Sequence, residues 1–324
     1  MAVETFPILR LPSIARENFL KSLDPVRVFL LSQLSRKMKR AIKAEYKKTG
    51  QELSVTVDYF TCISVCFSGT TTGDFFVHDA RRSILQKVRL EDRLADPEGG
   101  RFSPRIPTFR FYKCDILGHT KQFLAELMDV FSFPIAKFYI DISSYENYQS
   151  VIQWVNTYCP ITQLIRIDGR EIDFEDYCWI LENLESPNNV EFDVPIHNYE
   201  HRECGVPTFR AGKIKILHGE FVRLCHLQSL NGMEYNIGKA TINDEELNEF
   251  LRDLVAGANP NLKKLTLEEY GRTVIDDVLK DLGARNIGEN QWSFGLENGN
   301  EVVLSYCVSD PESKSSIDII INRN

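Results

Sequence analysis

Three side chains of the kind that bind metal ions lie close together in the segment HNYEHREC. His197, His201 and Cys204 fall within eight residues of one another. Imidazole and thiolate groups suit Zn²⁺, which would need a fourth ligand from elsewhere in the chain. The sequence has no CxxC pair to supply one, and a polar surface loop explains the segment equally well. We therefore expect neither a metal nor another cofactor.

Cys225 and His226 are the other candidates for chemistry, as a nucleophile and its base. Neighbouring side chains on a helix or strand point apart, so we expect no hydrogen bond between this thiol and this imidazole. The sequence also lacks the patterns GxGxxG, GxxxxGKS/T, GxSxG and HExxH, which mark phosphate-binding loops, nucleophiles and zinc proteases. We predict that the chain is not an enzyme.

The charge of the chain argues against a nucleic-acid-binding protein, because its net value is −8. Residues 36–48 are the exception, with seven lysines and arginines against one glutamate. This basic run is either a nuclear-localisation or nucleic-acid patch or the solvated face of a helix. An apolar run of about 18 residues and a signal peptide are both missing from the sequence, so we expect a soluble protein, cytoplasmic and/or nuclear, without a membrane partner.

The elements that would position such side chains begin with short helices. In SIARENFLKSL the apolar residues recur at helical spacing. Asp24-Pro25 then ends this helix and begins the next, because Asp caps a helix and Pro is favoured in its first turn. About 35 residues are too few to enclose a core of their own. The helices therefore either pack on the rest of the chain or present a surface to another protein.

The spacing of Leu11-Pro12, FLKSLDP and LLSQLSRKMK resembles an F-box over residues 6 to about 43. This resemblance implies binding to a Skp-type adaptor and, through it, to the cullin of a ubiquitin ligase. The alternative is a helical hairpin that packs only on its own C-terminal domain. The resemblance implies these adaptor contacts: Leu11, Pro12, Ile14, Phe19, Leu20, Leu23, Pro25, Leu30, Leu31 and Leu34.

Beyond Gly50 the pattern predicts strands. ELSVTVDYFTCISVCFSG is rich in β-forming residues, and DFFVHD is its expected hairpin partner. From there, strand-like apolar residues recur about every 25 residues, at Leu117, Ile142, Ile167, Phe192, Ile216, Ile242 and Leu267. Such a period, with helical patterns between, predicts an irregular leucine-rich-repeat-like α/β solenoid over residues 108–270, with right-handed strand-helix-strand crossovers.

Residues 133–269 resemble the type 2 F-box-associated domain of the large nematode F-box families, most strongly from DEELNEFL through GANPNLKKLTL. The two resemblances imply an N-terminal all-helical F-box (1–48), a β-rich connecting segment (49–107), the solenoid (108–270), and a C-terminal cap with a β hairpin in WSFGLENGNEVVLSYC (271–324).

The combined interpretation is a substrate-recognition adaptor of a Skp-cullin-F-box ubiquitin ligase that recruits an unidentified protein substrate. The alternative is a non-catalytic scaffold that joins no ligase. Because side chains alternate along a strand, residues between the apolar strand positions should face outward and contact the substrate. These are Tyr139, Asp141, Arg166, Asp168, Glu191, Asp193, Lys215 and Thr241.

Overall fold

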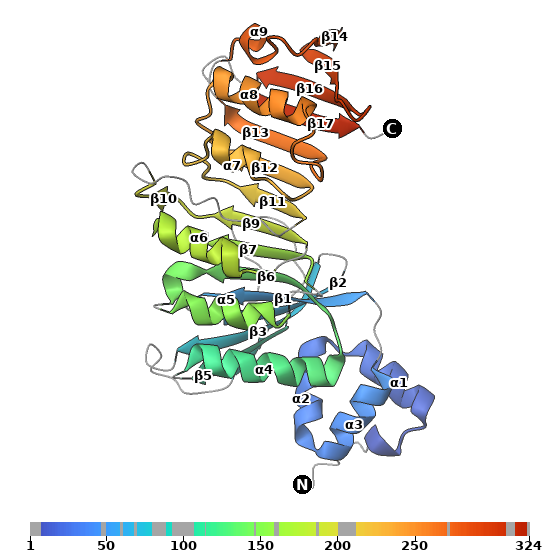
Figure 1. The fold of residues 1–324 in the computed structure, drawn as a ribbon. Helices are drawn as coiled ribbons and strands as arrows, with labels where there is room; N and C mark the ends of the chain where they lie inside the picture. The colour runs from blue at the N-terminus through green and yellow to red at the C-terminus, as the bar shows by residue number, and fades with distance from the viewer. Residues whose placement is uncertain are drawn as a thin grey trace, which may run out of the picture. The chain divides into compact units, whose positions relative to one another are not determined.

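The structure is a computed structural model, and it describes residues 8–46, 50–58, 61–67, 70–79, 89–92, 107–113, 115–145, 147–158, 162–185, 188–199, 212–270, 273–308 and 315–322. The chain divides into two compact units, residues 1–139 and 140–324. It is a mixed α/β structure (Figure 1). The domain limits expected from the sequence stay a prediction.

Unit 1 opens with the expected helices: a 3-10 turn over Ile8–Arg10, α1 (Ser13–Ser22), α2 (Pro25–Leu34) and α3 (Arg36–Glu45). Asp24 caps α2, since its carboxylate accepts a hydrogen bond of 2.8 Å from the amide of Arg27. Ser35 caps α3 in the same way, through the amide of Met38 at 3.1 Å. The predicted helix boundary at Asp24-Pro25 is confirmed.

The rest of unit 1 is a sheet with one long helix. Antiparallel pairing joins β1 (Gln51–Val57) to β2 (Thr61–Phe67) and β2 to β3 (Thr70–Asp79), which confirms the predicted hairpin. β5 (Pro107–Lys113) is parallel to β3 and antiparallel to β4 (Arg89–Asp92). The strand order is β6-β1-β2-β3-β5-β4, with β6 at Ile135–Asp141, and α4 covers Ile116–Phe131.

An aromatic cluster forms the core between these elements. The ring of Phe29 on α2 lies 5.4 Å from that of Phe75 on β3 and 5.2 Å from that of Phe123 on α4, both edge to face. Tyr46, just after α3, lies 5.6 Å from Phe131 at the end of α4. α2 and the end of α3 therefore pack on the remainder of unit 1, as one of the two sequence interpretations expected.

Unit 2 contains five adjacent parallel strands: β7 (Leu164–Asp168), β9 (Asn189–Asp193), β11 (Lys213–Ile216), β12 (Glu234–Gly238) and β13 (Lys264–Tyr270). Figure 1 shows helices on one face of these strands, namely α5 (Tyr148–Asn156), α6 (Phe174–Asn183), α7 (Leu224–Gln228) and α8 (Asp244–Val255). A 3-10 turn covers Ile142–Ser144, and a two-stranded parallel pair joins β8 (Ile172–Asp173) to β10 (Ile196–His197).

The register corrects the expected repeat. The paired residues across the five strands are Ile167, Phe192, Ile216, Ile237 and Leu267, so the steps are 25, 24, 21 and 30 residues. The short step contains a helix of only five residues, α7, whereas the long step contains α8 with twelve.

Three of the expected strand positions do not lie in strands. Leu117 lies in α4, Ile142 begins the 3-10 turn, and Ile242 lies between β12 and α8. Ile142 and Ile242 are buried and Leu117 is half-buried, so apolar residues outside strands were included in the expected period.

The predicted C-terminal hairpin is confirmed. Beyond β13 and α9 (Ile275–Val278), the sheet of unit 2 continues with antiparallel strands in the order β17 (Ser315–Asn322), β16 (Glu301–Val308), β15 (Gln291–Gly295) and β14 (Arg285–Gly288).

Candidate functional site

The surface of α1 and α2 carries two unusually exposed apolar side chains. Ile14 is 73% exposed and Leu34 is 72% exposed, more than any other large apolar side chain in the described residues. Burying such a side chain is worth about 1.5 to 3 kcal/mol, so these two are suited to contact another protein.

The other residues expected to contact the adaptor differ in how far they are buried. Leu20 and Pro25 are buried within unit 1, and Pro12 is exposed. Half-buried are Leu11, Phe19, Leu23, Leu30 and Leu31. The expected set is therefore a mixture of residues on the surface and residues that hold the helices together.

Ion pairs fix these helices in place. The guanidinium of Arg16 on α1 donates through Nε to the carboxylate of Glu45 on α3 at 2.6 Å. Lys39 pairs with Asp129 on α4 at 2.9 Å, and Lys43 pairs with the same carboxylate. The lysine hydrogen bonds lower the pKa of Asp129. Part of the basic run thus has a structural partner on α4.

The face of the unit 2 sheet opposite its helices carries a lattice of ion pairs. The guanidinium of Arg166 on β7 lies 2.8 Å from Asp168, 2.7 Å from Asp193 on β9 and 3.8 Å from Glu191. The hydrogen bond to Asp168 is the main cause that raises the pKa of Arg166. Four expected substrate contacts therefore meet at one point.

Two side chains that the sequence analysis missed extend this lattice. His218 lies 3.4 Å from Asp193, and the ammonium of Lys239 lies 3.2 Å from the other ring nitrogen of His218. Lys239 also lies 3.7 Å from Glu220. Each of His218 and Lys239 follows a buried strand residue by two positions, Ile216 and Ile237. Polar residues just after a buried strand were the signal that would have found them.

The remaining expected substrate contacts are placed differently. Lys215 is half-buried on β11, opposite Glu191. Asp141, at the end of β6, accepts hydrogen bonds from the amide of Ser143 at 2.9 Å and the hydroxyl of Ser144 at 2.8 Å. Tyr139 is half-buried on β6, in unit 1.

Thr241 corrects the expectation that it lies in a strand. It follows the end of β12 and donates to the carbonyl of Glu220 at 2.9 Å. Its exposed side chain therefore belongs to the connection between β12 and α8, beside the lattice.

The Cys225-His226 pair contradicts the sequence expectation. The thiol sulphur lies 3.6 Å from Nδ1 of His226, so the two side chains do meet. Nδ1 also accepts the amide hydrogen of Arg223 at 3.0 Å, and burial lowers the pKa of His226. The imidazole is therefore a weak base whose lone pair already has a donor, and the contact does not produce an activated nucleophile.

The candidate metal ligands lie partly outside the described residues. His201 and Cys204 are not described, whereas His197 contacts Asp173 at 3.2 Å. Over the residues that are described, no group of three or more metal-ligating side chains forms. The same part of the chain contains no helix whose length and apolar character would suit a membrane crossing.

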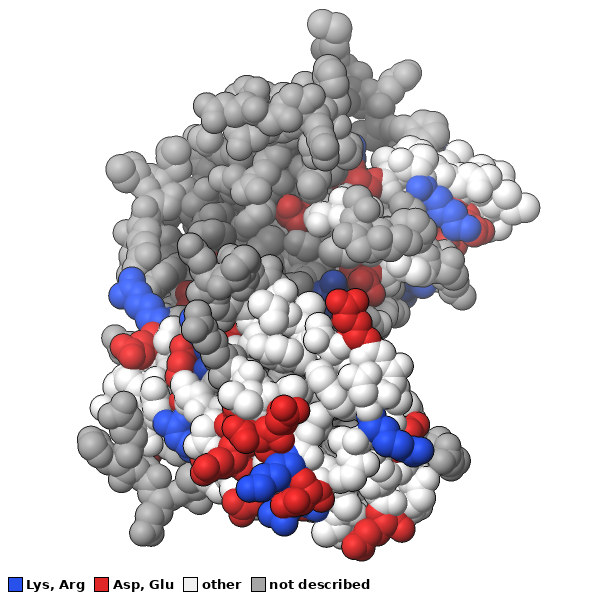
Figure 2. All heavy atoms as spheres, turned by 90° about the horizontal axis from the view of Figure 1, so that it is seen from above, with Lys and Arg blue, Asp and Glu red and all other residues white. Residues whose placement is uncertain are grey.

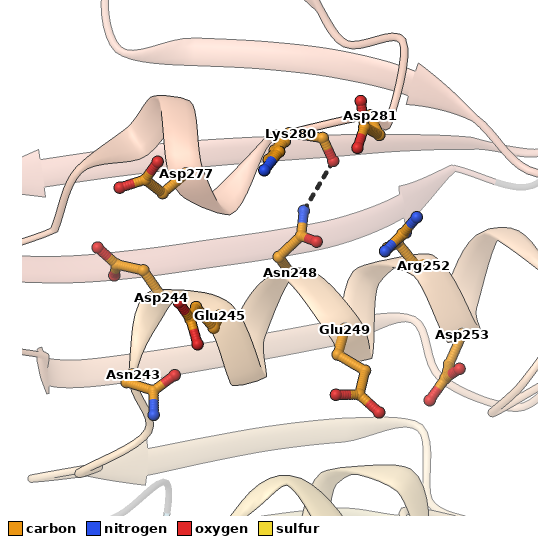
Figure 3. Close-up of a pocket in the computed structure, with 10 residues that line it drawn as sticks. All are labelled: Asn243, Asp244, Glu245, Asn248, Glu249, Arg252, Asp253, Asp277, Lys280 and Asp281. Carbon is orange, nitrogen blue, oxygen red and sulfur yellow. Dashed lines mark hydrogen bonds between the residues drawn. The ribbon is translucent and has the colours of Figure 1, made fainter.

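A cleft of about 990 Å³ lies on the other side of unit 2, between α8 and the region of α9. Figure 3 shows its lining, in which Asn248 donates to the carbonyl of Lys280 at 2.9 Å. Six carboxylates and two cations line it: Asp244, Glu245, Glu249, Asp253, Asp277, Asp281, Arg252 and Lys280. Across the described surface visible in Figure 2, acidic and basic side chains lie close together.

Comparison with known proteins gives one match. A family model described as F-box associated matches residues 201–267. Within the described residues this segment holds β11, α7, β12, α8 and the start of β13, including the positions of His218 and Lys239. No curated protein and no solved structure matches the chain. The resemblance of this region to an F-box-associated domain is thereby confirmed.

Proposed function

We propose that the chain is the substrate-recognition adaptor of a Skp-cullin-F-box ubiquitin ligase. The match of residues 201–267 to an F-box-associated family supports a role in protein recognition in an F-box context. The observation that carries the adaptor half of the proposal is the exposure of Ile14 and Leu34 on the first two helices. An adaptor with an apolar groove would bury both.

In this role the chain performs no chemistry. It holds a substrate near a ubiquitin-loaded enzyme and so raises the effective concentration of the two reactants. The lattice around Arg166, on the strand face opposite the helices, is the proposed substrate surface. We include in the proposal that the five parallel strands of unit 2 are an irregular leucine-rich-repeat-like array.

The test is a pull-down with a purified Skp-type adaptor. Ile14→Asp and Leu34→Asp should each weaken adaptor binding by about tenfold or more, because each removes about 1.5 to 3 kcal/mol of apolar burial and adds a charge. Val274→Asp and Ile287→Asp are matched controls, since their side chains are 57% and 53% exposed in unit 2. These controls should bind the adaptor as the unchanged chain does.

Leu20→Asp is a poor probe of binding, because Leu20 is fully buried and the variant would disrupt the helices themselves. Failure of the folded, unchanged chain to bind any Skp-type adaptor would overturn the ligase proposal. That outcome would favour a non-catalytic scaffold.

A further inference from the structure

The first helix of the chain has little apolar packing to hold it. Residues 8–22 are all described, and Leu20 is the one buried residue among them. The next helix, α2, buries several apolar side chains, including Phe29. A helix with as few buried apolar contacts as α1 is held in one orientation only when polar contacts add to them.

Arg16 on α1 supplies these polar contacts. Its guanidinium donates to both carboxylate oxygens of Glu45, the last residue of α3, and the distance from Nε to Oε2 is 2.6 Å. Nη1 of the same group lies 3.2 Å from the carbonyl oxygen of Leu9 and 3.5 Å from that of Leu11. One side chain thus joins α1 to the turn before it and to the end of α3. Two parallel hydrogen bonds to a carboxylate fix the orientation of the two groups as well as their distance.

The pair of Arg16 with Glu45 is also shielded from solvent. The side chain of Arg16 is 18% exposed and that of Glu45 is 15% exposed. A second ion pair of α1, between Glu17 and Lys21, is more exposed and joins two residues of the same helix. The two pairs therefore differ in what they can do, because only the first links α1 to another element.

The link made by Arg16 lies between the two exposed apolar side chains of the proposed adaptor surface. Ile14 is on α1, two residues before Arg16. Leu34 is the last residue of α2, and Ser35 alone separates it from α3. Since α2 is held to the sheet of unit 1 by Phe29, the place of Ile14 relative to Leu34 depends on the contact between α1 and α3.

We propose that Arg16 is a positioning residue of the adaptor surface, which holds Ile14 and the Leu11–Pro12 segment in the arrangement that a Skp-type adaptor binds. The guanidinium acts through these neighbours and does not itself contact the adaptor. This inference rests on the proposed function and adds a residue outside the expected adaptor contacts. If only a fraction of the molecules has the competent arrangement, the apparent dissociation constant rises by the inverse of that fraction.

The test measures the affinity of the chain for a purified Skp-type adaptor by isothermal titration calorimetry. Arg16→Gln should weaken binding about tenfold, which corresponds to a competent fraction of about one tenth. The matched control is Lys21→Gln, which removes a cation and an ion pair from α1 but breaks no link to another element. It should bind the adaptor as the unchanged chain does.

Charge reversal separates positioning from direct contact with the adaptor. Arg16→Glu and Glu45→Arg should each weaken binding, because each places two like charges together. The variant with both changes restores an ion pair between α1 and α3, so it should bind the adaptor more tightly than either single variant. A guanidinium that acted by touching the adaptor would not be replaced in this way.

Coupling to Ile14 separates positioning from a general loss of the fold. Arg16→Gln should weaken binding by a smaller factor in an Ile14→Ala background than in the unchanged chain, because a side chain that Arg16 positions is then missing. A variant that only destabilised the fold would lower the affinity by the same factor in both backgrounds.

Three results would overturn the inference and leave the proposed function standing. They are equal affinities of Arg16→Gln and Lys21→Gln, no recovery in the combined charge reversal, and equal losses in the two Ile14 backgrounds. Failure of the unchanged chain to bind the adaptor would overturn both the proposed function and this inference.

Discussion

His226 is an imidazole enclosed by aromatic rings, with Phe221 at 5.7 Å and Phe174 at 6.3 Å. Its Nε2 is buried without a hydrogen-bond partner in the described structure. Burial, followed by the charge of Arg223, lowers its pKa below the ordinary value of 6.5. The folded state therefore favours the neutral ring.

Because the folded state favours the neutral ring of His226, protonation of this ring destabilises the fold. The unfolded chain binds a proton on this ring more readily than the folded chain, so the stability that neutral His226 contributes is present above about pH 6.5 and is lost as the pH falls. We expect the free energy of unfolding, measured with urea, to decrease between pH 7.5 and 5.5. In His226→Gln this decrease should be smaller. An equal decrease in His226→Gln and in the unchanged chain would contradict this assignment.

Phe29 is the residue that most directly joins α2 to the sheet of unit 1. Phe29→Ala should cost about 3 to 5 kcal/mol of unfolding free energy, because it leaves a cavity among packed rings. Urea denaturation followed by circular dichroism measures the loss. Leu34→Ala, at an exposed position of the same helix, should cost little. Similar losses in both variants would contradict the packing described here.

The structural role of a single residue could be predicted from the sequence where that role depends only on neighbouring residues. Asp24 could be identified as a cap because capping depends on neighbours in the sequence. His218 and Lys239 could be located as polar residues just after a buried strand, but their partners could not, because strand pairing brings Asp193 close to His218, and His218 close to Lys239. Cys225 and His226 depart from the side-chain directions of a regular helix because they lie in the first turn of α7, where the His226 ring turns back to the amide of Arg223.

At the scale of elements, α8 is a helix whose first turn is fixed by its own sequence. Asn243 accepts from the amide of Glu246 at 2.8 Å, and Glu246 accepts from the amide of Asn243 at 3.1 Å, which is a complete capping box. Asn243→Ala should cost about 1 kcal/mol of unfolding free energy. Glu249→Ala, exposed in the middle of the same helix, is the control and should change stability little. An unchanged midpoint in urea for Asn243→Ala would show that the box is dispensable.

The strands β7, β9, β11 and β13 and the helices α5, α6 and α8 of unit 2 could be predicted, but α7, β12 and the spacing could not. Apolar periodicity identifies a strand or a helix wherever one face is buried, as in NDEELNEFLRDLVAG. It does not identify how many turns of helix separate two strands. The five-residue α7 and the twelve-residue α8 give intervals of 21 and 30 residues, whose average conceals the irregularity.

At the scale of the molecule, unit 1 is a shared core rather than a free-standing helical module. Leu20, Val26 and Phe29 are buried, and the ring of Phe29 packs on Phe75 of β3 and Phe123 of α4. A fragment of residues 1–46 should therefore show little helix by circular dichroism and no cooperative unfolding, because it lacks the rings that cover Phe29. A fragment of residues 1–145 should unfold cooperatively. Cooperative unfolding of the short fragment would contradict this prediction.

The packing of Phe29 on Phe75 and Phe123 also determines which segment of this chain can be exchanged with that of another protein. A chimera that exchanged only residues 1–46 for the equivalent helices of another protein would place foreign side chains against Phe75 and Phe123. Such a graft should succeed only when the donor supplies a ring of similar volume at the position of Phe29, since packed cores tolerate swaps that conserve volume. The portable segment of this chain is thus larger than its first three helices, and recombination points belong beyond β6.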